Sequence, residues 1–321
     1  MDSLPAQAVS AEQAGLTLAA LLRARMPGVS WSRIKALIDA RRVTVGGDLC
    51  RDPARRLKQG DVVELLARPL PPPPSPEQIV LRHLDDHLVV VEKPAGMNTV
   101  RHPAELSWNQ RRKLLSPTLQ DLVPLAIAQS TGSRGPRIRI VHRLDKETSG
   151  LLVFARSVAA ESGLGKQFQT HRVVRRYLAI VRGQAPSGTI RSTLVRDRGD
   201  GRRGSGEGGK LAVTHVELLE DLGSYSLVQC RLETGRTHQI RIHLSEQGHP
   251  VAGDKVYHRR ADGVELPDLS GAPRLMLHAA ELGFTHPISG ETLHWQMGLP
   301  SDMQALLDRL RQRSNPRGHR N

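Results

Sequence analysis

Apolar residues recur along most of the chain in short runs separated by charged or glycine-containing turns. From residue 79 onward this pattern predicts strands at 87–92, 137–141, 151–155, 173–182, 211–219, 225–233 and 275–284. Helical spacing of apolar positions predicts helices at 118–129, 157–170, 237–247 and 301–313. Strands outnumber helices and often follow one another directly, which predicts an α+β fold with a mixed, largely antiparallel sheet and flanking helices.

The first part of the chain has a different pattern. Two helices are expected there, the second over residues 30–42 with Ser30 as its N-cap. Its buried face should carry the apolar residues at helical spacing, which are Trp31, Ile34, Leu37 and Ile38. Short strands are expected at 43–45, before a Gly-Gly turn, and at 61–65. Residues 12–66 are therefore expected to form a small α/β module.

Prolines separate this module from the rest of the chain. Six of them lie within residues 69–76, and such a run favours extended polyproline geometry. We therefore expect a linker at 67–78, a large domain at 79–301, and a basic C-terminal helix and tail at 302–321. A length of 321 residues accommodates one large and one small domain.

The charge of the chain indicates a polyanionic partner. There are 46 Lys and Arg against 32 Asp and Glu, which gives a net charge of +14. An excess of this size is typical of nucleic-acid binding, and the predominance of Arg favours phosphate recognition. No apolar run approaches the roughly 18 residues of a membrane span, so no membrane contact is expected. The two distant cysteines, Cys50 and Cys230, form no CxxC motif and suggest a reducing compartment, which predicts a cytoplasmic protein.

Residues 142–150 (HRLDKETSG) carry the most informative candidate chemistry. An acid, Asp145, stands between basic residues in a turn that interrupts two apolar runs, 138–141 and 151–155. This arrangement places a carboxylate at the end of a strand, where catalytic side chains are commonly presented. Taken alone, however, an Asp in a turn more often indicates only a surface ion pair.

Segment 142–150 resembles the signature of the RluA-type pseudouridine synthases, which isomerise uridine in structural RNA. Two further blocks match the same family: 92–96 (EKPAG), and 234–244 (TGRTHQIRIHL) followed by 248–254 (GHPVAGD). The resemblance spans residues 88–254 and implies the pseudouridine synthase fold with a central RNA cleft. The first module is similar to the small RNA-binding domain named after ribosomal protein S-four.

The resemblance implies which residues carry the chemistry. Asp145 would be the catalytic residue, as nucleophile or as proton-transfer group, and the sequence leaves both roles open. Arg241 is the preferred partner that orients it, and Arg236 is the second choice, with phosphate binding as its other role. Tyr177 would stack on the target uracil, although a core aromatic is the commoner role for Tyr in such a strand.

Several basic residues are expected to bind the RNA. A uridine in folded RNA reaches an aspartate only after leaving its stack, and the resemblance implies that Arg143 fills the vacated space. His142 is expected to support the turn or to contact phosphate, and Lys93 to contact RNA. In the first module, phosphate contacts are expected from basic residues of the second helix and its flanks, which are Arg33, Lys35, Arg41, Arg42 and Arg55.

Other classes of protein fit the sequence less well. Residues 204–210 have the spacing of a phosphate-binding loop, but Leu211 stands where such loops need Ser or Thr. The 14 His show no metal-ligand spacing, so a metal-dependent nuclease is disfavoured and neither a metal nor a cofactor is expected. We predict a monomeric pseudouridine synthase acting on ribosomal RNA, with transfer RNA as the second choice. A noncatalytic RNA-binding ribosome-assembly protein is the alternative.

Overall fold

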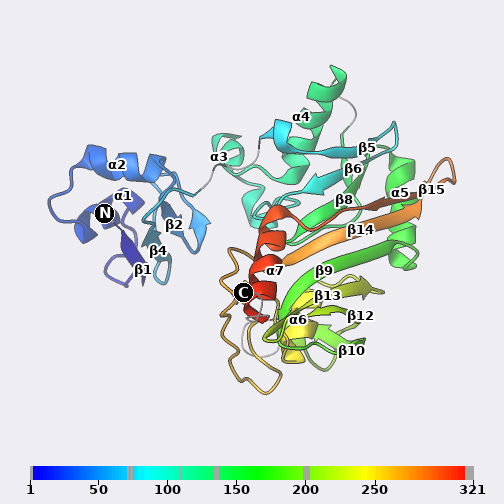
Figure 1. The fold of residues 1–321 in the computed structure, drawn as a ribbon. Helices are drawn as coiled ribbons and strands as arrows, with labels where there is room; N and C mark the ends of the chain where they lie inside the picture. Colours follow the sequence, from blue (N-terminus) through cyan, green and yellow to red (C-terminus); the bar gives the residue numbers. More distant parts are fainter. Residues whose placement is uncertain are drawn as a thin grey trace, which may run out of the picture. The chain divides into compact units, whose positions relative to one another are not determined.

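The computed structural model describes residues 3–70, 72, 75–108, 110–133, 137–197 and 203–314. The chain divides into two compact units (Figure 1). The first comprises Met1–Pro73 with Asn109–Ser116, which includes helix α3 (Gln110–Leu115), and the second comprises Pro74–Trp108 with Pro117–Asn321. Three of the six expected linker prolines, at 71, 73 and 74, and the end of the tail lie outside the described residues.

The first unit contains a four-stranded sheet and two helices that share one core. The strand order is β1-β4-β2-β3. The elements are β1 (Leu4–Ala8), α1 (Leu18–Arg25), α2 (Trp31–Asp39), β2 (Val43–Val45), β3 (Asp48–Leu49) and β4 (Val62–Leu65). Strand β1 pairs with β4, so the sheet begins before residue 12, where the sequence pattern placed the start of the module.

Helix α2 follows the predicted pattern with two differences. Ser30 caps it as expected, since its hydroxyl accepts the N–H of Arg33 at 3.3 Å. The helix ends at Asp39 instead of Arg42, and Arg41 has a left-handed backbone with φ 62° that cannot continue a right-handed helix. Trp31, predicted to be buried, is 44% exposed, and the Arg23 guanidinium lies 4.9 Å from the centre of its ring. The other three apolar residues of the face are buried.

The second unit is built on an eleven-stranded sheet, most of it in the order β11-β10-β12-β13-β9-β14-β8-β6-β5. In addition, strand β15 pairs with β14, and β7 pairs with β8. The strands are β5 (Leu81–Leu84), β6 (Leu88–Lys93), β7 (Arg139–Ile140), β8 (Ser149–Ala155), β9 (Val174–Arg182), β10 (Gly188–Val195), β11 (Gly204–Ser205), β12 (Lys210–Asp221), β13 (Tyr225–Leu232), β14 (Leu277–Thr285) and β15 (Thr292–Gln296). Among the described strands, only β8 and β14 pair in parallel, which confirms the predicted mixed, largely antiparallel sheet.

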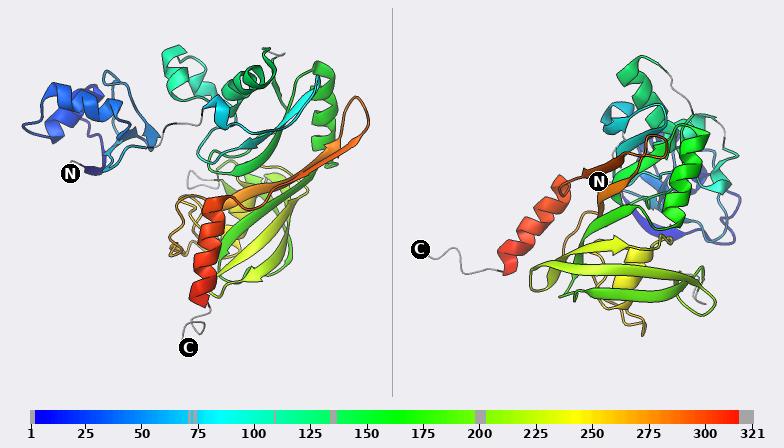
Figure 2. Two further views of the ribbon diagram at one scale, coloured as in Figure 1. Left: turned by 45° about the horizontal axis from the view of Figure 1, so that its top comes forward. Right: turned by 90° about the vertical axis from the view of Figure 1, so that its right-hand side faces the viewer.

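Helices flank this sheet on both faces (Figure 2). They are α4 (Leu119–Thr131), α5 (Val158–Gln169), α6 (Gln239–Glu246) and α7 (Ser301–Ser314), with 3-10 turns at Pro76–Gln78 and Pro103–Glu105. Because side chains alternate along a strand, Val89 and Val91 of β6 join the core that contains α4, while Leu88 and Val90 join the core that contains α5. Both faces of β6 are therefore buried. No helix in the described part of the chain is long and apolar enough to cross a bilayer.

Gly150 allows β8 and β14 to approach each other. Its backbone has φ +119°, and a Cβ at this position would overlap the backbone of Ala279, its register partner on β14. We expect Gly150→Ala to lower the free energy of unfolding by about 3 kcal/mol through backbone strain and overpacking. Thermal denaturation would measure this effect. Gly188→Ala is the control, because nothing lies near its Cβ, and equal melting temperatures for the two variants would contradict the prediction.

Candidate active site

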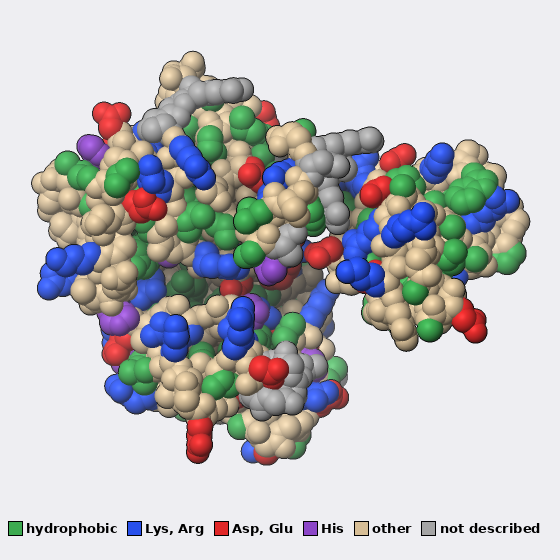
Figure 3. Space-filling view, turned by 180° about the vertical axis from the view of Figure 1, so that it is seen from behind, with side chains coloured by type: hydrophobic (Ala, Val, Ile, Leu, Met, Phe, Trp, Pro, Cys, Tyr) green, Lys and Arg blue, Asp and Glu red, His purple; other side chains and the backbone are tan. Residues whose placement is uncertain are grey.

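A cavity of about 500 Å³ lies in the second unit, a volume in the range of ligand-binding sites. Its walls come from the segment around residues 141–148, from α5 and β9, and from the chain entering α6. Asp145, Tyr177 and Arg241, which the sequence named as one site from three distant segments, all line it. In Figure 3 this unit is hollowed, and Lys and Arg side chains stand along the rim of the hollow.

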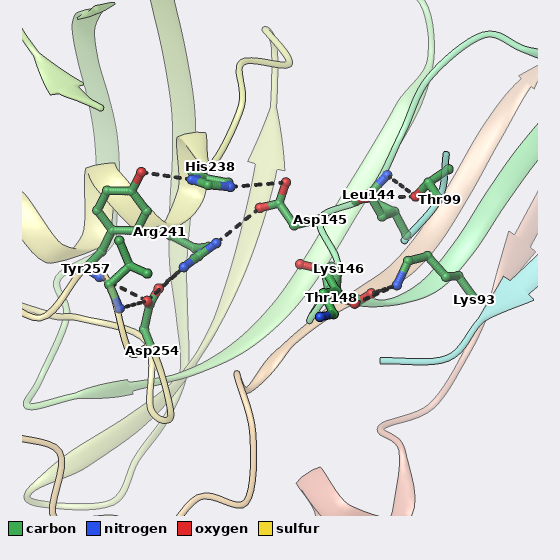
Figure 4. A network of polar contacts seen from close by, with 11 residues as sticks. Lys93, Thr99, Leu144, Asp145, Lys146, Thr148, His238, Arg241, Asp254 and Tyr257 are labelled. Carbon is green, nitrogen blue, oxygen red and sulfur yellow. Dashed lines mark hydrogen bonds and ion pairs between the residues drawn. The ribbon is translucent and has the colours of Figure 1, made fainter. Parts of the chain in front are cut away.

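The Asp145 carboxylate faces two nitrogen-bearing side chains of α6 and its N-cap (Figure 4). Its Oδ2 lies 3.6 Å from Nη1 of Arg241, and its Oδ1 lies 3.9 Å from Nε2 of His238. The Asp145 side chain is 18% exposed, so it is accessible from the cavity yet largely removed from bulk water. Of the two arginines considered as its partner, Arg241 is the one whose guanidinium reaches it.

Arg241 is held by an aspartate that the sequence reasoning did not assign. Asp254 accepts two hydrogen bonds from its guanidinium, at 2.6 Å from Nε and 2.9 Å from Nη2. The Asp254 side chain is fully buried and also accepts the backbone N–H groups of Val256 and Tyr257. Burial alone would lower the pKa of Arg241, but the hydrogen bonds and charge of Asp254, together with Asp145, raise it. Arg241 is therefore a fixed cation with its remaining nitrogen directed at Asp145.

His238 and Tyr257 complete this wall of the cavity. His238 is the N-cap residue of α6 and has a left-handed backbone with φ 59°, which costs a non-glycine residue about 1 kcal/mol or more. Its Nδ1 lies 2.8 Å from the Tyr257 hydroxyl. Burial lowers the pKa of His238 more than the nearby Asp145 raises it, so the imidazole is neutral near pH 7. His238 lies within the motif at 234–244, from which no role was predicted for it.

The backbone around Asp145 is anchored by the last residue of β6, Lys93, and by Thr99 in the segment that follows this strand. Lys93 is 1% exposed, and its ammonium donates to the carbonyls of Pro94 (2.8 Å), Lys146 (2.9 Å) and Thr148 (2.8 Å). Thr99 holds the other side, because its hydroxyl donates to the carbonyl of Leu144 and accepts the N–H of the same residue. The RNA contact expected of Lys93 is therefore wrong, since the side chain is enclosed and fully engaged by the loop.

Replacing Lys93 by methionine tests this anchoring role. Burial lowers the pKa of Lys93 to about 7, yet its three carbonyl acceptors match the three N–H bonds of an ammonium group. Lys93→Met removes the ammonium that donates to those carbonyls, and we expect about 3 kcal/mol of lost stability together with reduced turnover. Thermal denaturation and a turnover assay would be compared with Lys166→Met, a control at an exposed lysine. A stable Lys93→Met with weakened RNA binding alone would restore the original assignment.

Of the two roles expected of His142, support of the turn fits the structure better than a phosphate contact. Its ring stacks on Phe168 with the ring centres 4.4 Å apart, and its Nε2 accepts the backbone N–H of Val153 at 3.1 Å. Burial, followed by the nearby charge of Arg175, lowers the pKa of His142 to about 3. A neutral imidazole whose acceptor nitrogen already receives the Val153 N–H supports the turn, and it has no positive charge with which to bind phosphate.

Tyr177 is 8% exposed in β9, and burial raises the pKa of its hydroxyl.

The remaining basic candidates differ in how far their own fold engages them. Arg143 and Arg236 are exposed at the cavity, and Nε of Arg236 donates to the carbonyl of Leu211 at 3.0 Å. In the first unit, Arg33 and Lys35 are exposed on α2, while Arg55 is half-buried. Arg41 and Arg42 donate from Nε to the carbonyls of Leu70 and Leu66, so they also fasten the segment after β4. Among the described residues, no group of His, Cys, Asp and Glu is placed to hold a metal ion.

Comparison with known proteins finds a matching family model in each of the two units. Residues 87–246 match the family model described as RNA pseudouridylate synthase, and residues 17–63 match the S4 domain. Ribosomal large subunit pseudouridine synthase D of Zymomonas mobilis is 40% identical over 316 residues, covering 93% of this chain and 95% of the relative. The protein of that name from Neisseria meningitidis is 40% identical over 314 residues, covering 94% and 81%.

A solved structure is similar as well. Human RNA pseudouridylate synthase domain containing 4 is 25% identical with a TM-score of 0.58, and the match covers 72% of this chain and 92% of the chain in that structure. Matches to a synthase family model, to near full-length relatives and to a solved synthase agree with the motif at residues 142–150. The chain therefore belongs to the RNA pseudouridylate synthase family of isomerases and carries an S4 domain in its first unit.

Proposed function

We propose that this enzyme converts uridine to pseudouridine in large-subunit ribosomal RNA, with Asp145 as the catalytic carboxylate. The observation that carries the proposal is the position of Asp145 in a cavity, 3.6 Å from a guanidinium that Asp254 fixes in place. The name shared by relatives from Zymomonas and Neisseria supports the choice of ribosomal RNA. The target uridine leaves its stack to enter the cavity, because a stacked base is inaccessible to Asp145.

The reaction breaks the C1′–N1 bond of uridine and forms a bond from C1′ to C5. The proton on C5 is released and N1 takes up a proton, so the product is an isomer of the substrate. Asp145 acts as nucleophile or as proton carrier, and both roles need a carboxylate held near the ribose and base. In this proposal Arg241 orients Asp145, Tyr177 stacks on the uracil, and Arg143 fills the space that the base vacates.

The S4-type domain captures the RNA separately from the catalytic domain. The S4-type domain, whose sheet begins with β1 (Leu4–Ala8) and which extends to residue 66, is joined by the linker at 67–78 to a catalytic domain at 79–301 and a basic helix and tail at 302–321. The positively charged residues of the S4-type domain add salt-dependent affinity for RNA without recognising a particular base sequence. The protein acts as a monomer in the cytoplasm, where ribosomal RNA is modified.

Mapping pseudouridines in cells with and without the protein tests this function. Carbodiimide treatment blocks primer extension at pseudouridine, and the lost signals are expected in large-subunit ribosomal RNA. Signals lost only from transfer RNA would assign the second substrate. Unchanged maps, combined with altered ribosome assembly, would favour the noncatalytic RNA-binding alternative. Release of tritium from RNA labelled at C5 of uridine provides an independent measure of turnover.

A further inference from the structure

One cation in the cavity is not accounted for by the catalytic wall. Arg175 lies on β9 two residues before Tyr177, so both side chains share one face of the strand, and both line the cavity. Arg175 is only 8% exposed. Among the described residues, no carboxylate forms an ion pair with it. A guanidinium buried without a counter-charge strongly attracts an anion.

The surroundings of Arg175 orient it without neutralising it. Its Nη2 donates to the carbonyl of Glu233 at 3.2 Å, and its Cζ lies 5.5 Å from the ring centre of Phe168. Its Nε is buried and has no hydrogen-bond partner. A Cβ on Gly235 would lie 2.8 Å from Nη1, so the absence of a side chain there leaves room for this nitrogen beside the cavity. Donor capacity therefore remains unused at the cavity wall.

The adjacent residue on the same strand, Arg176, is an arginine that does pair with a carboxylate. Arg176 points to the other face of the sheet, where Nη1 lies 2.9 Å from Oε2 of Glu281, and its side chain is 41% exposed. Arg175 and Arg176 thus have the same charge and the same strand, but only Arg175 faces the cavity. The pair offers a matched comparison.

We propose that Arg175 binds a backbone phosphate of the uridine nucleotide that enters the cavity. Guanidinium groups match phosphate oxygens in geometry and charge, whereas uracil is neutral. Two residues along a strand span roughly 7 Å, so Arg175 stands about one base-to-phosphate length from Tyr177. The inference rests on the proposed reaction at Asp145, and it assigns Arg175 the positioning of the nucleotide that reacts there.

Binding of two small probes tests the inference without turnover. Uridine and uridine 3′,5′-bisphosphate are titrated into the full-length protein by calorimetry or NMR, and the gain in affinity from the phosphates is compared among variants. We expect Arg175→Met to reduce that gain roughly tenfold or more, as for a lost charge-assisted hydrogen bond, while Arg176→Met leaves it unchanged. Equal gains in Arg175→Met and the wild type would overturn the proposal.

Further variants keep the result interpretable. If Arg175→Met does not fold, Arg175→Lys decides, because it keeps the charge but loses the planar fork. Its gain should then fall below that of the wild type, and a full gain would overturn the proposal. Titrations in the Asp145→Asn background separate the two hypotheses. If Arg175→Met loses the affinity gained from the phosphates in this background, the phosphate site is upheld even if the wild type proves inactive on RNA. If Arg175→Met keeps that gain, the site is refuted even if the enzyme is active.

Discussion

Asp145→Asn is expected to reduce pseudouridine formation by at least about 10³-fold, because an amide serves neither as nucleophile nor as proton carrier. The substitution changes little in shape, and the anchors of the surrounding loop, Lys93 and Thr99, bind backbone groups that it leaves intact. The defect should therefore be confined to chemistry. Tritium release from RNA labelled at C5 of uridine reports it directly, since the C5 proton leaves in the reaction.

Two comparisons make the Asp145 result decisive. RNA affinity, measured by filter binding, should stay close to that of the wild type, because the S4 domain and the basic rim of the cavity are unaltered. Asp262→Asn is the control, since Asp262 is half-exposed and pairs with Arg260 at 3.3 Å. Wild-type turnover in Asp145→Asn would remove Asp145 from the mechanism and with it the proposed assignment of the active site.

Asp254→Ala is expected to cause the largest loss of stability among the substitutions considered. It leaves the Arg241 guanidinium, whose side chain is 10% exposed, without its buried counter-ion. Breaking a buried ion pair from one side costs about 3–5 kcal/mol, and this should lower the melting temperature by roughly 10 °C. The N–H groups of Val256 and Tyr257 also lose their acceptor. Arg241 then becomes free to turn away from Asp145, so turnover should fall as well.

A double variant separates the two effects of Asp254. Arg241→Met with Asp254→Leu removes both charges, and replacing a buried ion pair by apolar residues is often close to neutral for stability. We expect this variant to recover part of the lost stability but none of the activity. Recovery of activity would show that neither member of the pair orients Asp145. Asp262→Ala serves as the surface control, because an exposed pair contributes at most about 1 kcal/mol.

The sequence predicted the sheet best where strands are buried. Strands β6 and β8 consist of continuous apolar runs and were located nearly to the residue. Strands β10 and β15 were missed because most of their side chains are partly or fully exposed, so burial leaves little apolar signal in them. Trp31 was misplaced for a related reason, since spacing puts it near the buried face of α2 but does not show where the core ends.

The site was only partly predictable because its partners lie far apart in the chain. The motif at 142–150 named Asp145, and the second block contained Arg241, but Asp254 and His238 were read as parts of a motif without roles. Lys93 was expected to contact RNA, and for His142 both a phosphate contact and support of the turn were left open, because both side chains can donate to phosphate. Whether such a group meets solvent or the backbone carbonyls of another segment depends on tertiary packing, which composition and spacing do not report.

Local sequence by itself determined the main strands and helices, the presence of a separate basic module, and the aspartate that marks the family, because these depend on periodicity and on residues within one segment. Only the tertiary structure decided which arginines pair with a carboxylate and which face the cavity. Neighbouring Arg175 and Arg176 are chemically identical, yet the strand directs one to Glu281 and the other into the cavity. Their difference arises from the elements packed on the two faces of the sheet, and these come from distant parts of the chain.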